Sequence, residues 1–305
     1  MKKKILITGV AGFIGSMLAK KFVKKGFKVY GIDDLSSGKL SSIPKEVEFL
    51  KLDLSQKVNF NSFLKECKFI MHLAGQSSGE ISFENPQRDL EKNTLATLNL
   101  IEKAIENKIE RIVYASSMSV YGNCLDKMKE TTKLSPLSCY GIGKIASENY
   151  LKIFSKKLPY VIFRMFNVYG PGQDLENLKQ GMVSIYLSQA IKNKKIIVKG
   201  SSKRKRDFIY IDDVVDIWFK SIFQNNVINQ TFNLGSGKAN SIKELLALIL
   251  NYFPDCKVKY RKPTPGDQFY VCSDNSFLKK KFKIKKFISL KDGLKKFIKN
   301  STSID

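Results

Sequence analysis

The sequence predicts an α/β fold, in which a doubly wound parallel sheet is joined to a smaller, mixed α/β domain. Two observations carry this prediction. Short apolar runs alternate with helical patterns through the first half of the chain, and a glycine-rich turn follows the first of these runs. The 305 residues, of which 43% are hydrophobic, are enough to bury a large core.

Six runs rich in Val, Ile, Phe and Tyr are predicted to be strands. Because these runs are apolar throughout, they are typical of parallel strands that are buried on both faces. Helical patterns separate them, which favours right-handed β-α-β crossovers. The predicted strands are residues 3–10, 27–33, 47–54, 69–75, 111–117 and 160–167, and the predicted helices are residues 16–26, 59–66, 89–107 and 140–157.

The pattern changes after about residue 166, where the loops lengthen and helices mix with short strands. We therefore expect residues 1–165 to form the first domain and residues 166–305 to form mainly the second. A segment near 207–235 is expected to return to the first domain.

Three glycines, Gly9, Gly12 and Gly15, stand between the first predicted strand and the first predicted helix. Gly9 allows a sharp turn, Gly12 allows a ligand to approach closely, and Gly15 allows the helix to pack on the strand. The free N–H groups of the first helical turn suit a pyrophosphate. The spacing G-x-x-G-x-x-G is one residue longer than the usual fingerprint, and it predicts a Rossmann-type dinucleotide site.

An acidic residue, Asp33, follows at the end of the second predicted strand. A carboxylate there accepts hydrogen bonds from both ribose hydroxyls of an adenosine and repels a 2′-phosphate, which favours NAD over NADP. The alternative is an aspartate that caps a turn or a helix. Asp53 and Leu54, at the end of the third predicted strand, are expected to contact the adenine.

A tyrosine and a lysine, Tyr140 and Lys144, open the predicted helix 140–157 and share one of its faces. The lysine ammonium, together with a bound nicotinamide, would favour the phenolate and let Tyr140 act as a base near neutral pH. Ser117, at the end of a strand, is expected to hold a substrate alcohol in line. A Tyr–Lys pair at this spacing is usually structural. In a sequence that also has the glycine turn and Asp33, it indicates a catalytic site.

With these residues in order, the sequence resembles the extended short-chain dehydrogenases/reductases, and within them the NAD-dependent nucleotide-sugar epimerase/dehydratase family. It looks most like the UDP-glucose 4-epimerase branch, over nearly the whole chain. The motifs that carry the resemblance are TGVAGFIGS (8–16), GIDDLSSG (31–38), HLAG (72–75), SSMSVYG (116–122), Tyr140-x-x-x-Lys144, RMFNVYGPG (164–172) and RDFIYIDDV (206–214).

The resemblance implies further contacts with NAD and with a sugar nucleotide. Asn167 and Arg206 would hold the diphosphate, to which a guanidinium is well suited. The alternative for Arg206 is an ion pair with Asp207 or Asp212. Lys144 would lie near the nicotinamide, and the other implied cofactor contacts are Phe13, Ile14, Leu73, Ala74 and Asn93.

The implied reaction is 4-epimerisation through a transient 4-keto sugar. Tyr140 would take the proton of the 4-hydroxyl while C4 gives a hydride to NAD, and the hydride would return to the other face. A 4,6-dehydratase needs a second acid–base pair, which the family usually places directly after the catalytic hydroxyl residue. Those positions are Met118 and Ser119 here, which argues against dehydration. A 4-keto reductase stays open.

Two positions bear on the substrate. In place of the family's Arg-x-Gly-Asp the chain has Thr264-Pro265-Gly266-Asp267, so a phosphate-binding arginine is missing, and Arg261 is expected to substitute for it. Val271 matches the gate residue of the epimerases, where a small side chain admits N-acetyl sugars. We therefore expect a UDP-hexose or a UDP-N-acetylhexosamine, with UDP as the default nucleotide. Another departure is Gln76 after HLAG, so the substrate-facing loop 76–85 is expected to differ.

The composition limits the possible partners. The net charge of +25 raises nucleic acid as a partner, but no helix-turn-helix, zinc-finger or RNA-recognition pattern accompanies it, so nucleic acid is not expected. A non-catalytic NAD- or RNA-binding module remains the alternative of another class. A single histidine and the lack of any C-x-x-C pair argue against a metal site.

Cysteine usage and hydropathy point to the compartment. Five scattered cysteines suit a reducing cytoplasm, and no apolar run approaches the roughly 20 residues that span a bilayer, so no membrane segment is expected. Apolar residues on the predicted helices near 88–107 and 140–157 suit a homodimer contact, as the resemblance implies. The expected pathway is the synthesis of sugars for a bacterial surface polysaccharide.

Overall fold

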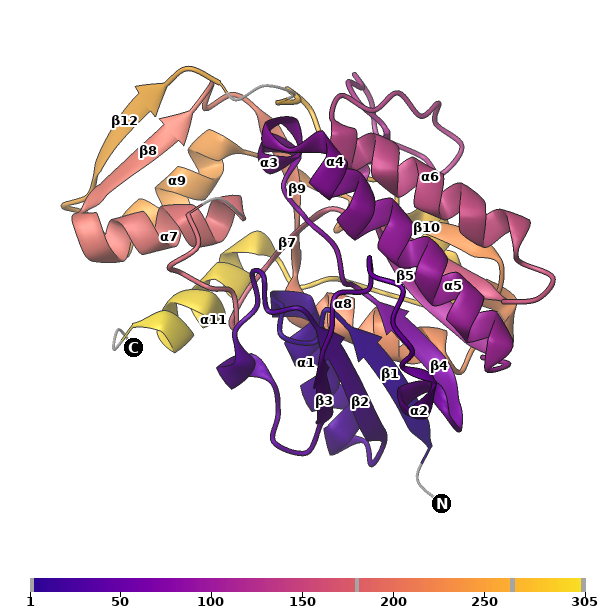
Figure 1. Cartoon of the computed structure of the whole chain (residues 1–305). Coiled ribbons are helices and arrows are strands. Elements are labelled where there is room, and N and C mark those ends of the chain that lie inside the picture. Colours follow the sequence, from indigo (N-terminus) through magenta and orange to yellow (C-terminus); the bar gives the residue numbers. More distant parts are fainter. Residues whose placement is uncertain (1–2, 179–180, 264–266, 303–305) are drawn as a thin grey trace. The chain divides into compact units, whose positions relative to one another are not determined.

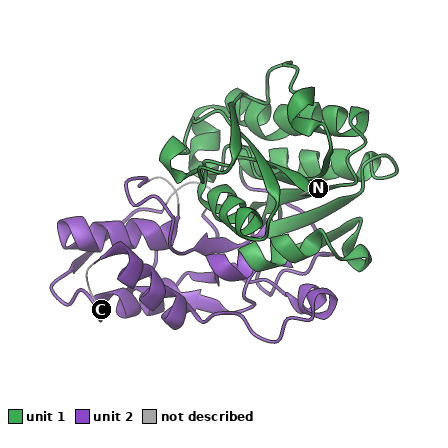
Figure 2. Ribbon diagram, turned by 90° about the horizontal axis from the view of Figure 1, so that it is seen from below, with its two compact units in different colours: residues 1–120, 138–164, 215–232 green, residues 121–137, 165–214, 233–305 purple. Residues whose placement is uncertain are grey.

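A computed structural model describes residues 3–178, 181–263 and 267–302 of the chain (Figure 1). The chain forms two compact units (Figure 2). Unit 1 comprises residues 1–120, 138–164 and 215–232, and unit 2 comprises residues 121–137, 165–214 and 233–305. The returning segment 215–232 lies inside the range expected from the sequence, whereas residues 121–137 belong to unit 2 instead of the first unit.

A seven-stranded sheet forms the centre of unit 1, in the order β10-β6-β5-β4-β1-β2-β3. β1 pairs in parallel with β2 and β4, β2 with β3, and β4 with β5, so these strands end at one edge of the sheet. The doubly wound, Rossmann-type α/β fold predicted from the sequence is confirmed. The strands are β1 (Lys4–Thr8), β2 (Lys28–Asp33), β3 (Glu48–Lys51), β4 (Cys67–His72), β5 (Arg111–Ser117), β6 (Tyr160–Met165) and β10 (Gln230–Leu234).

The helices of the first half follow the predicted pattern with two differences. The helix expected at 59–66 is a single turn, α2 (Asn61–Leu64). The helix expected at 89–107 is interrupted by a π-helical turn, η2 (Glu91–Leu95), and such turns are frequent at functional sites. The others are α1 (Phe13–Lys24), α3 (Gly79–Glu84), α4 (Pro86–Leu90), α5 (Ala96–Glu106) and α6 (Cys139–Ile153). In the second half of the chain, α8 (Ile211–Ser221) leads into the returning segment.

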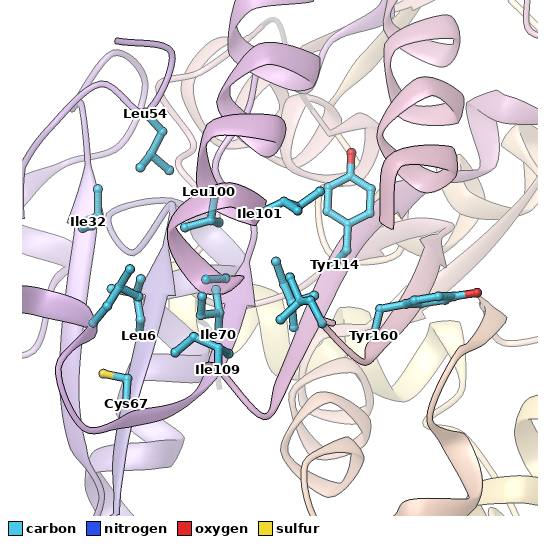
Figure 3. Packing of buried hydrophobic residues seen from close by; sticks show 14 of the residues in the cluster. Leu6, Ile32, Leu54, Cys67, Ile70, Leu100, Ile101, Ile109, Tyr114 and Tyr160 are labelled. Atoms are coloured by element: carbon cyan, nitrogen blue, oxygen red, sulfur yellow. The ribbon is translucent and has the colours of Figure 1, made fainter. Parts of the chain in front are cut away.

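The hydrophobic core of unit 1 lies between the sheet and the helices that cover it (Figure 3). Leu6 of β1, Ile70 of β4 and Tyr114 of β5 are fully buried there and meet Leu100 and Ile101 of α5. Because the strands are apolar on both faces, the sheet is covered by packed side chains on each side. The core thereby places the ends of β1, β2, β4 and β5 next to one another.

Unit 2 contains two small sheets. The three-stranded sheet, in the order β11-β9-β7, is formed by β7 (Asn167–Tyr169), β9 (Lys205–Tyr210) and β11 (Ala239–Ser241). β8 (Lys195–Lys199) and β12 (Lys257–Arg261) form the two-stranded sheet. The helices are α7 (Met182–Asn193), α9 (Ile242–Leu250), α10 (Ser276–Phe282) and α11 (Leu290–Ser301). None of the helices in the described ranges is both long and apolar enough to cross a bilayer.

Candidate active site

The glycine turn joins β1 to α1. Gly9 has a φ of +69°, a conformation that favours glycine, and a Cβ there would lie 2.7 Å from the backbone nitrogen of Ala74. A Cβ on Gly15 would lie 2.0 Å from the carbonyl oxygen of Gly9. Gly12 is the N-cap of α1 and contributes no side-chain hydrogen bond, so the first N–H groups of the helix stay available. Phe13 and Ile14 are half-buried in that first turn.

Asp33 faces this turn from the end of β2. Its Oδ2 accepts a hydrogen bond from the Ala11 N–H at 3.0 Å, and its Oδ1 accepts one from the Leu35 N–H at 2.8 Å. Burial raises the pKa of the carboxyl, and the two backbone hydrogen bonds act in the opposite direction. Asp33 thus braces a turn, as in the alternative taken from the sequence, at the position where a ribose is expected.

Asp53 and Leu54, the two residues expected to contact the adenine, both have their side chains engaged within the protein. Asp53 forms an ion pair with Lys92 at 2.7 Å, and Lys92 also pairs with Asp34 at 2.5 Å. The Leu54 side chain is buried in the hydrophobic core (Figure 3), so only its backbone is left for a cofactor contact. The sequence does not reveal this lysine bridge, because Lys92 and its two partners lie on three separate segments of the chain.

The three candidate catalytic side chains come together in unit 1. Ser117 ends β5, and Tyr140 and Lys144 lie in the first turns of α6, whose N-cap Ser138 accepts a hydrogen bond from the Gly141 N–H at 3.2 Å. All three catalytic candidates are buried. Lys144 Nζ lies 5.6 Å from the centroid of the Tyr140 ring. Leu73 and Ala74, after β4, are half-buried, and their N–H groups bond to Thr8.

Burial governs the protonation of this pair. It raises the pKa of Tyr140 to about 12, although the hydrogen bond with Ser117 lowers it. Burial also lowers the pKa of Lys144 to about 8, against the raising effect of Asp89 and Glu148. The pKa of Tyr140 in the chain by itself is therefore high. The sequence-based expectation of a base near neutral pH relied on Lys144 together with a bound nicotinamide, and it stays a prediction.

A buried ion pair stands behind the catalytic side chains. Glu148, one helical turn after Lys144, accepts hydrogen bonds from Ser116 Oγ at 2.6 Å and from Arg164 at 2.7 and 2.9 Å. Glu148 thereby ties α6 to β5 and β6. Sequence reasoning missed this role, although the position of Glu148 four residues after Lys144 was a usable signal.

A second buried carboxylate, Asp89, was also missed. Its Oδ1 accepts hydrogen bonds from Gln76 Nε2 at 2.8 Å and from Asn93 Nδ2 at 3.0 Å, and only 2% of the residue is exposed. Its charge raises the pKa values of both Tyr140 and Lys144. Gln76, noted in the sequence as unusual, is the side chain that fixes this carboxylate.

Replacing Asp89 with asparagine is expected to move the whole pH profile of kcat to lower pH by about one unit. Without the negative charge, Tyr140 ionises at lower pH, and Lys144 also loses its proton at lower pH. Glu91→Gln, which neutralises an exposed acid two residues away, is the matched control. A profile that stays in place in Asp89→Asn would show that the carboxylate does not act on this pair.

The histidine of β4 is structural. His72 is fully buried, with Nδ1 2.7 Å from Thr8 Oγ1 and Nε2 2.9 Å from Thr97 Oγ1. Burial lowers its pKa to about 3, so the ring is neutral at physiological pH.

Unit 2 brings together three of the predicted substrate residues around β9. Asn167 Nδ2 donates to the Asp207 carbonyl at 3.0 Å, and the Val271 N–H donates to the Lys205 carbonyl at 3.1 Å. Arg206 lies between Lys205 and Asp207 on β9 and is buried, and so is the Val271 side chain. Arg261 does not share this environment, because its side chain is exposed on β12.

The ion-pair partner of Arg206 differs from the alternatives taken from the sequence. Arg206 Nη2 bonds to Asp267 at 2.5 Å, whereas Asp207 accepts hydrogen bonds from Ser236 and Ser273. The alternative considered from the sequence named Asp207 and Asp212 because proximity along the chain was the only guide to an ion-pair partner. Thr264, which stands where the family has an arginine, lies outside the described residues.

The residues of unit 1 fit NAD. Besides the uncapped start of α1, the structure offers a buried acceptor, Asn93 Oδ1, which has no hydrogen-bond partner within the described ranges. A buried amide oxygen of this kind requires a donor, and NAD carries ribose hydroxyl and carboxamide donors. Gly75 stands directly beside this oxygen, since a Cβ there would lie 2.5 Å from it.

Comparisons with known proteins agree with this geometry. A family model, the NAD dependent epimerase/dehydratase family, matches residues 5–235. A putative UDP-glucose 4-epimerase of Methanocaldococcus jannaschii is 34% identical over 307 residues, covering 96% of this chain and 97% of that relative.

Two solved structures are similar over almost the whole chain. The UDP-glucose 4-epimerase of Thermotoga maritima with UDP-glucose is 30% identical, with a TM-score of 0.91 and 98% of both chains covered. The UDP-N-acetylglucosamine 4-epimerase of Methanobrevibacter ruminantium in complex with UDP-N-acetylmuramic acid is 30% identical, with a TM-score of 0.92 and 99% of both chains covered.

Proposed function

Because the chain belongs to the NAD-dependent epimerase/dehydratase family, with NAD as its cofactor, we propose that it is a nucleotide-sugar 4-epimerase. It converts a UDP-hexose or a UDP-N-acetylhexosamine through a transient 4-keto sugar. The observation that carries the proposal is the meeting of Ser117, Tyr140 and Lys144 at the end of β5, with no acidic residue at positions 118 and 119.

The mechanism assigns one task to each side chain. Ser117 orients the 4-hydroxyl of the sugar, and Tyr140 accepts its proton and later returns it to the ketone oxygen. Lys144, protonated below a pKa of about 8, stabilises the phenolate. Bound NAD would supply the acceptor and donor of the C4 hydride. Asp33, Asn93 and the first turn of α1 hold the cofactor.

The two residues after Ser117 support epimerisation over dehydration. Met118 has no titratable group, and the Ser119 hydroxyl accepts a hydrogen bond from Ser117 Oγ at 3.2 Å. Removal of a proton from C5 and of water from C6 needs a second acid and base, which neither residue supplies. A 4-keto reductase does not need this second acid and base either, so it is the second candidate function for this site.

Proton NMR of the purified protein with UDP-, GDP- and CDP-linked hexoses and N-acetylhexosamines, without added cofactor, tests the proposal. We expect a C4 epimer pair to interconvert, with UDP sugars as the substrates. Turnover of UDP-galactose without any turnover of UDP-GalNAc would contradict the N-acetyl substrates proposed from Val271. A new C6 methyl signal would mean dehydration, and no change with any sugar would favour a reductase or a non-catalytic binding module.

A homodimer is part of the same proposal. Leu90 and Leu95 in the α4–η2 segment, and Ile142 and Ile153 in α6, are exposed apolar side chains of unit 1. Exposed apolar groups on long helices favour burial against a second copy. Sedimentation equilibrium that gave the mass of one chain at micromolar concentration would exclude it.

A further inference from the structure

Unit 2 contains a buried cluster of two arginines and one aspartate. Arg204 and Arg206 both bind the carboxylate of Asp267, and the exposed fractions of the three side chains are 7%, 5% and 11%. The two guanidinium groups carry two positive charges against one negative charge. A buried group with an excess charge is costly unless a further counter-charge binds to it, so the cluster is suited to an anion.

Arg204 is fixed by the loop that surrounds it. Its Nε donates to the Ser201 carbonyl at 2.9 Å, and its Nη2 donates to the Lys199 carbonyl. Gly200 has a φ of +83°, and a Cβ there would lie 3.1 Å from Arg204 Cζ. With Nη1 on Asp267, every nitrogen of this guanidinium already has a partner, so Arg204 acts as a fixed charge and not as a ligand for substrate.

The Asp267 carboxylate is shared between the two arginines. Oδ2 accepts from Arg204, and Oδ1 accepts from Arg206 Nη2. An isolated arginine and carboxylate tend to form two parallel hydrogen bonds, which would occupy one edge of the guanidinium. Because Arg204 holds one oxygen, Arg206 bonds to Asp267 through Nη2 alone. Its Nη1 donates to the carbonyls of Lys205 at 2.9 Å and Phe269 at 3.5 Å, and none of its described hydrogen bonds uses Nε.

We propose that Arg204 is a positioning residue that prevents Asp267 from pairing with Arg206 through two parallel hydrogen bonds, and so leaves the positive charge and the Nε–H of Arg206 for the diphosphate of the substrate. The proposal rests on the nucleotide-sugar function proposed above. It also replaces Arg261 as the residue that makes up for the arginine missing at position 264. The additional positive charge comes from Arg204, which directly precedes β9 and stands two residues before Arg206.

Isothermal titration with UDP and with uridine, on the full-length protein, tests this role. Arg204→Met is expected to weaken UDP binding by about tenfold or more, the usual effect of one lost charge-assisted hydrogen bond, and to change uridine binding less than about twofold. The double variant Arg204→Met/Asp267→Asn is expected to recover most of the UDP affinity, because no carboxylate remains to pair with Arg206. Lys203→Met removes an exposed charge one residue away and is the matched control.

Each other outcome has a definite meaning. Unchanged UDP binding in Arg204→Met, or equal losses for UDP and uridine, would overturn the proposal. A double variant without recovery would also overturn it, since Arg204 would then act other than through Asp267. If Arg204→Met fails to fold, Arg204→Gln, which keeps a donor to the loop carbonyls, takes its place. A wild-type protein that binds neither UDP, GDP nor CDP would overturn the nucleotide-sugar function itself.

Discussion

Replacing Tyr140 with phenylalanine is expected to lower kcat by about 10²- to 10⁴-fold, the range expected when a general base is removed. The substitution deletes one hydroxyl and leaves the ring in place, so the fold and the bound NAD should be retained. Turnover in the NMR assay gives kcat, and the NAD content after denaturation gives the occupancy. Tyr150→Phe makes the same change on a half-buried residue of α6 and serves as the control.

The pH dependence of the wild-type enzyme provides a second check on the same pair. Burial lowers the pKa of Lys144 to about 8, so its positive charge is present below that pH and lost above it. Activity should therefore fall as the pH rises past about 8, because the phenolate of Tyr140 loses its neighbouring cation.

A Tyr140→Phe variant that keeps more than a tenth of the wild-type kcat would remove Tyr140 from the role of base.

Gly15→Ala is expected to lower the stability of the fold, whereas Gly12→Ala is expected to weaken NAD binding. A Cβ on Gly15 would stand 2.0 Å from the Gly9 carbonyl oxygen, so the turn and α1 must separate, at a cost of at least about 3 kcal/mol in the free energy of unfolding. The nearest atom to a Cβ on Gly12 is 3.2 Å away, which needs only a small adjustment. Gly12→Ala should keep its stability within about 1 kcal/mol.

The effect expected of Gly12→Ala is weaker binding of NAD. A methyl group at the uncapped start of α1 stands where the pyrophosphate approaches, so we expect about tenfold weaker NAD binding. Urea unfolding of the cofactor-free variants separates the two effects from NAD titration. Equal loss of stability in both variants would show that the glycines have no separate tasks, and normal NAD binding by Gly12→Ala would place the pyrophosphate elsewhere.

The sequence by itself determined the sheet, the family and the cofactor. Apolar runs and helical periodicity are local properties, so β1, β2, β4, β5 and β6 appear close to where they were expected. The order of the motifs identified the family and NAD, and the comparisons confirm both. Ser117, Tyr140 and Lys144 were predicted as catalytic residues for the same reason, since the motifs are short and stand at fixed spacing, and the structure places their side chains together.

Only the tertiary structure decided the ion pairs and the protonation. Arg206 pairs with Asp267 and not with Asp207 or Asp212, the partners considered as the alternative from the sequence, because β9 and the segment after β12 meet only in the folded chain. Asp89 and Glu148 act on Lys144 from different helical turns, and burial sets the pKa values of Tyr140 and Lys144. Spacing along a chain records local conformation, whereas the partner of a charge and its degree of burial depend on which distant segments pack around it.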